Sequence, residues 1–513
     1  MNQQRQTMRP NDRKAGRKEW IGLAVLALPC MLYSMDLTVL NLATPLLSAD
    51  LKPTGSELLW IVDIYGFLLA GLLVTMGTLG DRIGRRKLLL IGAAAFGAAS
   101  VLAAFSTSPA MLIAARAVLG VAAATLAPST LSLIRNMFLD EQQRTFAVGV
   151  WIASFSTGAA IGPLIGGALL SHFWWGSVFL IAVPVMALLL VLGPIFLPEY
   201  RDPAGRLDIL SAGLSLASVL TVIYGIKQAA ESGFSLPMLL SIVIGVTLAI
   251  LFVRRQRSLR SPLIDLALFR RPAFAAALGA NILGFFIAFG AFLFIAQYLQ
   301  LVLGLTPLEA GLWTVPSGLA FIAGSMLTPV IAKRMRVTTA MAIGLALAAA
   351  GFLLLASADR LGAIVAGHAI FSLGLAPVFT LATDMMVSSV PPEKAGMASG
   401  IAETSSELGG ALGIAVLGSF ITVIYRSRMS GEQLAGIPGE TVEAARKTLA
   451  SAAAAAHELP KKSDEMLLLT TAQDAFALGF SWVAAMSAVL ALAGALLTIR
   501  VARITPEAAP GAA

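Results

Sequence analysis

The chain has 513 residues, of which 58% are hydrophobic and only 12% are charged, and its formal net charge is +8 at pH 7. This composition excludes a water-soluble globular protein of this size and is typical of a chain whose solvent is lipid, where only helices and closed barrels can span. Because no alternating strand pattern is present, we expect an all-α integral membrane protein.

Fourteen apolar segments follow one another along the chain, and each is long enough to cross a bilayer as a helix. A polar tail precedes the first segment, which is too long for the apolar region of a cleavable secretory signal, so we expect it to remain as an anchor. The predicted spans are 20–46, 58–80, 88–106, 109–134, 145–171, 174–197, 208–228, 235–253, 273–302, 307–331, 337–357, 361–389, 396–424 and 473–499.

The basic residues predict the orientation of these spans. Most of the 36 Lys and Arg residues lie in the N-terminal tail, in every second connection and after the last span, with large clusters at 82–87 and 254–271. Because Lys and Arg stay on the cytoplasmic side, we expect an even number of spans with both termini in the cytoplasm. The clusters then contact membrane lipids, and no nucleic-acid partner is expected.

The fifth predicted span carries an unusual glycine pattern. Gly158, Gly162 and Gly166 are four residues apart and share one helix face, where a neighbouring helix can approach closely. Pro163 removes a backbone hydrogen bond and favours a kink. Gly149 and Gly167 extend the pattern. The segment is either a helix that bends or slides during a transport cycle or a case of ordinary tight packing.

A weak internal repeat divides the chain. Ala127-Pro128 in the fourth span recurs as Ala376-Pro377 in the twelfth, which predicts two related six-helix halves around a central site. The predicted divisions are a cytoplasmic tail at 1–18, an N-terminal six-helix bundle at 19–200, two inserted transmembrane helices at 201–260, a C-terminal six-helix bundle at 261–501 and a cytoplasmic tail at 502–513. Residues 425–472 are expected to form one long outside loop with short amphipathic helices, either a lid or a tolerated insertion.

Acidic residues within apolar spans are the candidate groups for proton coupling and substrate binding, because a charge inside the membrane is costly and usually faces a cavity. If several line one cavity, its field is negative and favours cations. The candidates are Asp36, Asp63, Asp384, Glu403 and Glu407.

The position of each acid suggests its role. Asp36 lies past the middle of the first span and either exchanges protons or is a satisfied buried acid that fixes a kink. Glu403 and Glu407 share a helix face, so their titrations are coupled, unless they form a hydrogen-bonded pair that bridges to a neighbouring helix. Asp63 is expected to guide an outer gate or lie at the interface. Asp384 is an access point for substrate or a solvated helix end.

Other residues are candidates for gating and for aromatic contacts. Asp81, Arg82 and Arg85 are expected to pair across a joint at the cytoplasmic face in one state and to part in another. Arg116 either tunes a carboxyl group or holds the first bundle together. Aromatic side chains can stack on a lipophilic cation, or they face lipid and pack. The aromatic candidates are Trp60, Tyr65, Trp151, Phe155, Trp313 and Phe379.

The chain offers no recognisable cofactor site. Cys30 is the single cysteine, the three histidines are far apart, and no phosphate-binding G-x4-G-K-[ST] loop is present. We therefore expect neither a metal nor ATP as an energy source, and no enzymatic activity.

Motifs spread over most of the chain resemble those of the major facilitator superfamily. Gly149–Gly167 resembles its antiporter motif, Gly77–Lys87 its signature between the second and third helices, and Leu112–Gly120 its fourth-helix motif around Arg116. Met35–Pro45 and Glu403–Gly410 are similar to motifs of the fourteen-helix drug:proton antiporters of the QacA and SmvA type.

The resemblance implies a major facilitator fold with 14 transmembrane helices in a bacterial cytoplasmic membrane. It implies a proton-coupled antiporter, driven by the proton gradient without a cofactor, that exports small lipophilic cations such as quaternary ammonium antiseptics, dyes and methyl viologen-like compounds. A proton-coupled symporter or uptake carrier on the same fold is the alternative, and we expect a monomer.

Overall fold

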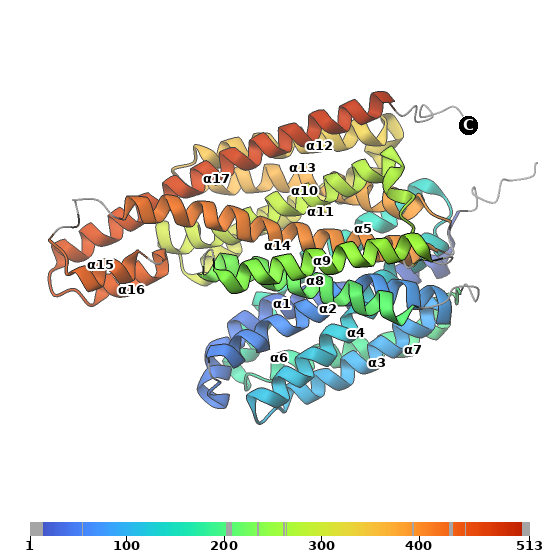
Figure 1. Ribbon diagram of the computed structural model, residues 1–513, viewed down its shortest axis with the longest axis horizontal. Coiled ribbons are helices and arrows are strands. Elements are labelled where there is room, and N and C mark those ends of the chain that lie inside the picture. The colour runs from blue at the N-terminus through green and yellow to red at the C-terminus, as the bar shows by residue number, and fades with distance from the viewer. Residues whose placement is uncertain are drawn as a thin grey trace, which may run out of the picture.

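The structure of the protein is a computed structural model that describes residues 14–504, apart from residues 54, 202–207, 233–234, 260–261, 263, 392–393, 430–433, 435 and 447. Within these residues every regular element is a helix (Figure 1). The elements are α1 (Arg17–Leu51), α2 (Gly55–Ile83), α3 (Arg85–Ala104), α4 (Pro109–Met137), α5 (Glu141–His172), α6 (Ser177–Leu180), α7 (Ala182–Phe196), α8 (Ile209–Ser232), α9 (Leu236–Ser258), η2 (Leu268–Arg270), α10 (Pro272–Gln297), η3 (Tyr298–Val302), α11 (Pro307–Arg334), α12 (Val337–Ala356), α13 (Leu361–Ser388), α14 (Ala395–Arg428), α15 (Gly439–Ala445), α16 (Leu449–His457) and α17 (Lys462–Ile504).

Several of these helices begin at residues that suit a helix start. Ser108 accepts a hydrogen bond from the backbone N–H of Met111, and Asp140 accepts one from Gln143. Thr306 and Glu309 form a capping box at the start of α11. Such side chains satisfy backbone N–H groups that the first helical turn leaves unpaired, so they position α4, α5 and α11.

The all-helical membrane fold agrees with the prediction from the sequence. Twelve segments of the described chain are long and apolar enough to cross a membrane. The other two predicted spans coincide with α5 and α8, helices of 32 and 24 residues, and the count of fourteen crossings stays a prediction. The sixth predicted span is interrupted, since α6 ends at Leu180 and α7 begins at Ala182.

The helices pack in two groups joined by a pair. In the first group α1 packs on α5 and α7, and α4 packs on α2 and α3. In the second, α12 packs on α13 and α17, and α10 packs on α13 and α14. α8 and α9 pack on each other, and α8 contacts both α2 and α14, one helix from each group. The exact limits of the predicted bundles stay predictions.

The two groups meet closely at one end of the molecule. We call this the basic end: it is where α2, α4 and α13 finish and α3, α5 and α14 begin. There Gly77 of α2 lies against the backbone of Gly396 in α14, and a Cβ added to Gly149 of α5 would lie 2.8 Å from the carbonyl oxygen of Ser325 in α11. Toward the opposite end, which carries α15 and α16, the two groups diverge (Figure 1).

The predicted outside loop, 425–472, is shorter than expected. α14 continues to Arg428 and α17 begins at Lys462, so both helices extend beyond the predicted spans. The two short helices α15 and α16 lie between them, and the hydroxyl of Tyr425 donates to the carbonyl of Ala445 at 2.9 Å. The two short helices agree with the prediction from the sequence. The hydropathy pattern ended α14 too early and began α17 too late.

Candidate functional site

A buried ion pair joins two of the predicted residues in the first half. Nη1 of Arg116 in α4 lies 2.5 Å from Oδ2 of Asp36 in α1, and the Arg116 side chain is 1% exposed. Nε of Arg116 also donates to the carbonyl of Ile61 in α2 at 3.0 Å. Arg116 therefore pairs with Asp36 and ties α1, α2 and α4 together, which favours the second of the two roles considered for it, that of holding the first bundle together.

A hydrogen bond crosses from this half to the other. The hydroxyl of Tyr33, one turn before Asp36 on α1, donates to Oε1 of Glu407 in α14 at 2.6 Å. Glu403, one turn before Glu407, is 8% exposed and interacts electrostatically with Glu407 and with Cys30 of α1. Asp36 is thus brought into one cluster between the halves with Glu403 and Glu407, which are far from it in the sequence. We call Asp36, Glu403 and Glu407, with Tyr33 and Arg116, the central cluster.

No ion pair or hydrogen bond of the Glu403 carboxyl group is found among the residues that the structure describes. Arg116 pairs with Asp36, whereas the buried Glu403 has no basic side chain paired to it in the described chain. Such a site favours a cation or a proton.

Aromatic side chains of the first half lie beside the central cluster. The ring of Tyr33 lies 5.4 Å from that of Phe155, which in turn lies 4.8 Å from Trp151. The guanidinium of Arg116 lies 4.7 Å from the ring centre of Tyr65. Aromatic rings beside acidic side chains suit a cation with apolar surface.

The six aromatic candidates separate into two groups. Tyr65, Trp151 and Phe379 are buried and Phe155 is partly buried, whereas Trp60 and Trp313 are each 44% exposed on the outside of the bundle. Trp60 and Trp313 are therefore not contacts of the central cluster, because apolar composition does not tell which face of a membrane helix points inward. Phe379 packs on Phe285 in the second half, with ring centres 4.3 Å apart.

Asp384 lies apart from the central cluster, in a contact between the halves at the basic end. Its carboxylate accepts from Nε of Arg144 and from the hydroxyl of Thr145, both at 2.8 Å, so α13 is tied to α5. The alternative of a solvated helix end is wrong, because Asp384 is only 8% exposed. The side chain of Asp63 lies outside the described residues.

The signature between α2 and α3 forms a second contact between the halves at this end. Asp81 pairs with Arg85, and the backbone N–H of Gly396 in α14 donates to the same Asp81 oxygen at 3.4 Å. Arg82 is exposed, and no ion pair involves it within the described chain, so it does not take part in the expected lock in this conformation.

The glycine face of α5 packs against α1. Gly158 lies directly against the backbone of Met31, and a Cβ on Gly166 would lie 2.8 Å from Cγ1 of Val39. Gly162 is buried between them, whereas Gly167 has nothing within 4 Å of an added Cβ, so it forms no notch. The side chain of Pro163 lies outside the described residues. The close crossing places Tyr33 beside Phe155.

Alanine substitutions should distinguish the face of α5 that packs on α1 from its open face. Gly158→Ala inserts a methyl group into the backbone of α1, and we expect a loss of about 1–3 kcal/mol of stability with loss of transport. Gly167→Ala should be neutral, because its surroundings are open. Thermal unfolding of the two purified variants in detergent checks this, and an equal fall in Tm for both would contradict the packing.

Sequence reasoning missed Tyr33, Arg144 and Thr145. The spacing of Tyr33 from Asp36 would have placed both on one helix face, which is a signal that was available. For Arg144 and Thr145 the sequence has no such signal, because their partner Asp384 is 240 residues away from Arg144.

Comparison with known proteins agrees with this architecture. Residues 26–414 match the profile of the Major Facilitator Superfamily. The chain is 43% identical over 490 residues to the multidrug efflux pump LfrA of Mycolicibacterium smegmatis, which covers 95% of this chain and 97% of LfrA. It is 35% identical over 491 residues to the methyl viologen resistance protein SmvA of Salmonella typhimurium, which covers 94% of this chain and 97% of SmvA.

Two solved structures are similar in fold. The human organic anion transporter MFSD10 has a TM-score of 0.58 at 16% sequence identity, over 92% of this chain and 99% of MFSD10. A bacterial homologue of the human lysosomal transporter Spinster has a TM-score of 0.55 at 16% identity, over 96% of this chain and all (100%) of that one. With the helical architecture and the matches along almost the whole sequence, these findings show that the chain is a membrane transporter rather than an enzyme, and that it belongs to the Major Facilitator Superfamily.

Proposed function

We propose that the protein is a proton-coupled antiporter that exports lipophilic cations across a bacterial cytoplasmic membrane. The observation that carries this proposal is the central cluster, in which acids from both halves meet with one compensating arginine. The relatives LfrA and SmvA, a multidrug efflux pump and a methyl viologen resistance protein, support export of drugs and of cations.

The chemistry follows from the charge balance of the cluster. Asp36 pairs with Arg116 at 2.5 Å, and the carboxyl groups of Glu403 and Glu407 attract the cation. Tyr33 and Phe155 supply rings against which the apolar part of the cation packs. When a proton binds Glu407 or Glu403, the cation loses its counter-charge and leaves. When the acid releases the proton on the other side, a new cation binds.

Alternating access requires the contacts between the halves to break. We propose that the basic end faces the cytoplasm, because Lys and Arg stay on that side. The halves are joined there by Asp384 with Arg144 and by Gly77 against Gly396, so this conformation belongs to the outward-facing part of the cycle. In the inward-facing part, the hydrogen bond of Tyr33 to Glu407 and the contacts of Asp384 have to open.

A vesicle experiment tests the proposal. Inverted membrane vesicles that contain the full chain are given a fluorescent lipophilic cation, and its accumulation is followed while the pH gradient and the membrane potential are collapsed separately and together. We expect accumulation to stop when both are collapsed, and addition of the cation to release protons from the vesicle lumen. Transport that persists without either gradient would overturn the proposal, and proton movement in the same direction as the cation would favour a symporter.

A further inference from the structure

The least buried of the twelve apolar segments carries a groove that ends in arginines. In α9 only 17% of the most apolar stretch is buried, and its mean hydropathy is 2.7. A groove of about 390 Å³ runs between this helix and α8. Residues that line it include Val222, Val246, Ile250, Val253, Arg254 and Arg257. The first of these belongs to α8 and the others to α9.

The length of the groove matches one leaflet of a bilayer. Val246, Ile250, Val253 and Arg257 are three or four residues apart, so they form one stripe along α9. From Val246 to Arg257 the helix rises about 16 Å at 1.5 Å per residue. Half of a hydrocarbon core of about 30 Å is about 15 Å, so an acyl chain along the stripe would end near the bilayer centre while its headgroup lay at the arginines.

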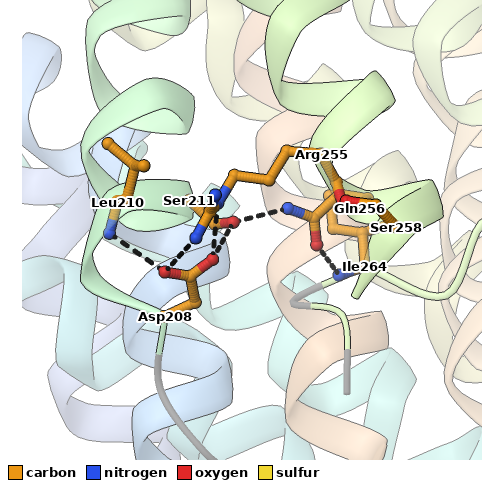
Figure 2. Close-up of polar contacts among 7 residues, drawn as sticks. All are labelled: Asp208, Leu210, Ser211, Arg255, Gln256, Ser258 and Ile264. Atoms are coloured by element: carbon orange, nitrogen blue, oxygen red, sulfur yellow. Dashed lines mark hydrogen bonds and ion pairs between the residues drawn. The ribbon is translucent and has the colours of Figure 1, made fainter. Parts of the chain in front are cut away.

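Arg254 and Arg257, at the end of the groove, differ from the neighbouring Arg255 in their ion pairs. Arg255 is held by Asp208 through two contacts of 2.7 and 3.1 Å, and Gln256 donates to Ser211 at 2.8 Å (Figure 2). These contacts fix the end of α9 to the start of α8. In the part of the chain that the structure describes, neither Arg254 nor Arg257 forms an ion pair. Their charge therefore remains available to a ligand.

We propose that this groove is a binding site for one anionic phospholipid, with its phosphate at Arg254 and Arg257 and one acyl chain along Val246 and Ile250. A guanidinium group matches a phosphate with parallel hydrogen bonds, and the apolar stripe matches the chain. Because α8 contacts α2 and α14, the lipid occupies the helix pair that touches both halves of the transporter.

Lipid binding to the full chain tests the site. Native mass spectrometry of the purified transporter with phosphatidylglycerol or phosphatidylethanolamine measures the affinity for each lipid, and Tm is recorded in parallel. For wild type we expect tighter binding of phosphatidylglycerol and a higher Tm with it. Loss of both charges in Arg254→Gln/Arg257→Gln should weaken phosphatidylglycerol binding about 30-fold, at about 1 kcal/mol for each arginine.

The matched control removes two charges at the same end away from the groove. Lys333→Gln/Arg334→Gln changes two exposed residues at the end of α11 and should bind phosphatidylglycerol as wild type does. Ala249→Trp fills the groove and keeps both arginines, so it should also lose the intact lipid, while soluble glycerol phosphate should not compete. Equal affinity of wild type for the two lipids, an equal loss in the control variant, or displacement of the lipid by glycerol phosphate would each overturn the proposal.

Discussion

Glu407→Gln is expected to reduce resistance to a lipophilic cation to the level of cells without the transporter, while the protein still folds. Gln has the size of Glu and keeps an oxygen that can accept the hydrogen bond that Tyr33 donates at 2.6 Å. The substitution removes the negative charge that attracts the cation and the group that exchanges the proton. Without an exchangeable proton at this site, the release of substrate is no longer coupled to the proton gradient.

The measurement is a drug-susceptibility panel in a pump-deficient host, with the amount of transporter in the membrane determined for each strain. Glu443→Gln is the matched control, since Glu443 lies exposed on α15 away from the central cluster. It should leave resistance unchanged. If Glu407→Gln cells remain as resistant as wild type at an equal amount of protein, Glu407 is not the coupling group.

A second variant distinguishes the charge of Glu407 from its hydrogen bond. Tyr33→Phe removes the hydroxyl that joins α1 to α14 and leaves Glu407 ionisable. Addition of a cation to proteoliposomes with this variant should still release protons, whereas Glu407→Gln should release none. Absence of proton release in both would place the coupling in the hydrogen bond between the halves rather than in the carboxyl group.

The sequence alone indicated candidate acids, because an acid within a long apolar run is conspicuous. The structure brings Asp36, Glu403 and Glu407 together and leaves Asp384 apart, and their roles in transport stay predictions. Glu403 and Glu407 were placed on one helix face by their spacing, and the glycine face of α5 was predicted to admit a close neighbour. The structure adds that the neighbour is α1, with Gly158 against Met31. These features are local, since they depend on a single helix and its period.

The remaining features depend on contacts between distant segments. Arg116 is 80 residues from Asp36, and Tyr33 is 374 residues from Glu407. Helical periodicity relates only residues a few positions apart, so it does not predict such pairs. In a membrane helix both the inner and the lipid-facing side are apolar, so the buried Trp151 and the exposed Trp313 look alike in the sequence. The structure was therefore needed to identify the partners of the acids and to tell buried aromatic side chains from lipid-facing ones.

The buried pair of Asp36 and Arg116 predicts a large loss of stability when one partner alone is removed. Asp36→Leu leaves the Arg116 guanidinium buried without its carboxylate, which typically costs about 3–5 kcal/mol. Arg116→Met has the same consequence for Asp36. Both single variants should therefore show a lower Tm and less protein in the membrane, so their loss of resistance has a structural cause as well as a functional one.

The double variant, Asp36→Leu/Arg116→Met, separates these causes. Replacing a buried ion pair by apolar side chains of similar volume is often neutral or stabilising, so Tm should return close to that of wild type. Resistance should stay absent, because the cluster has lost an acid and the arginine that balances it, and the central charge that binds the cation is no longer correctly placed. Thermal unfolding in detergent and the susceptibility panel measure the two effects independently. A double variant less stable than either single one would show that Asp36 and Arg116 stabilise the bundle separately, and full resistance in the double variant would exclude the pair from the transport cycle.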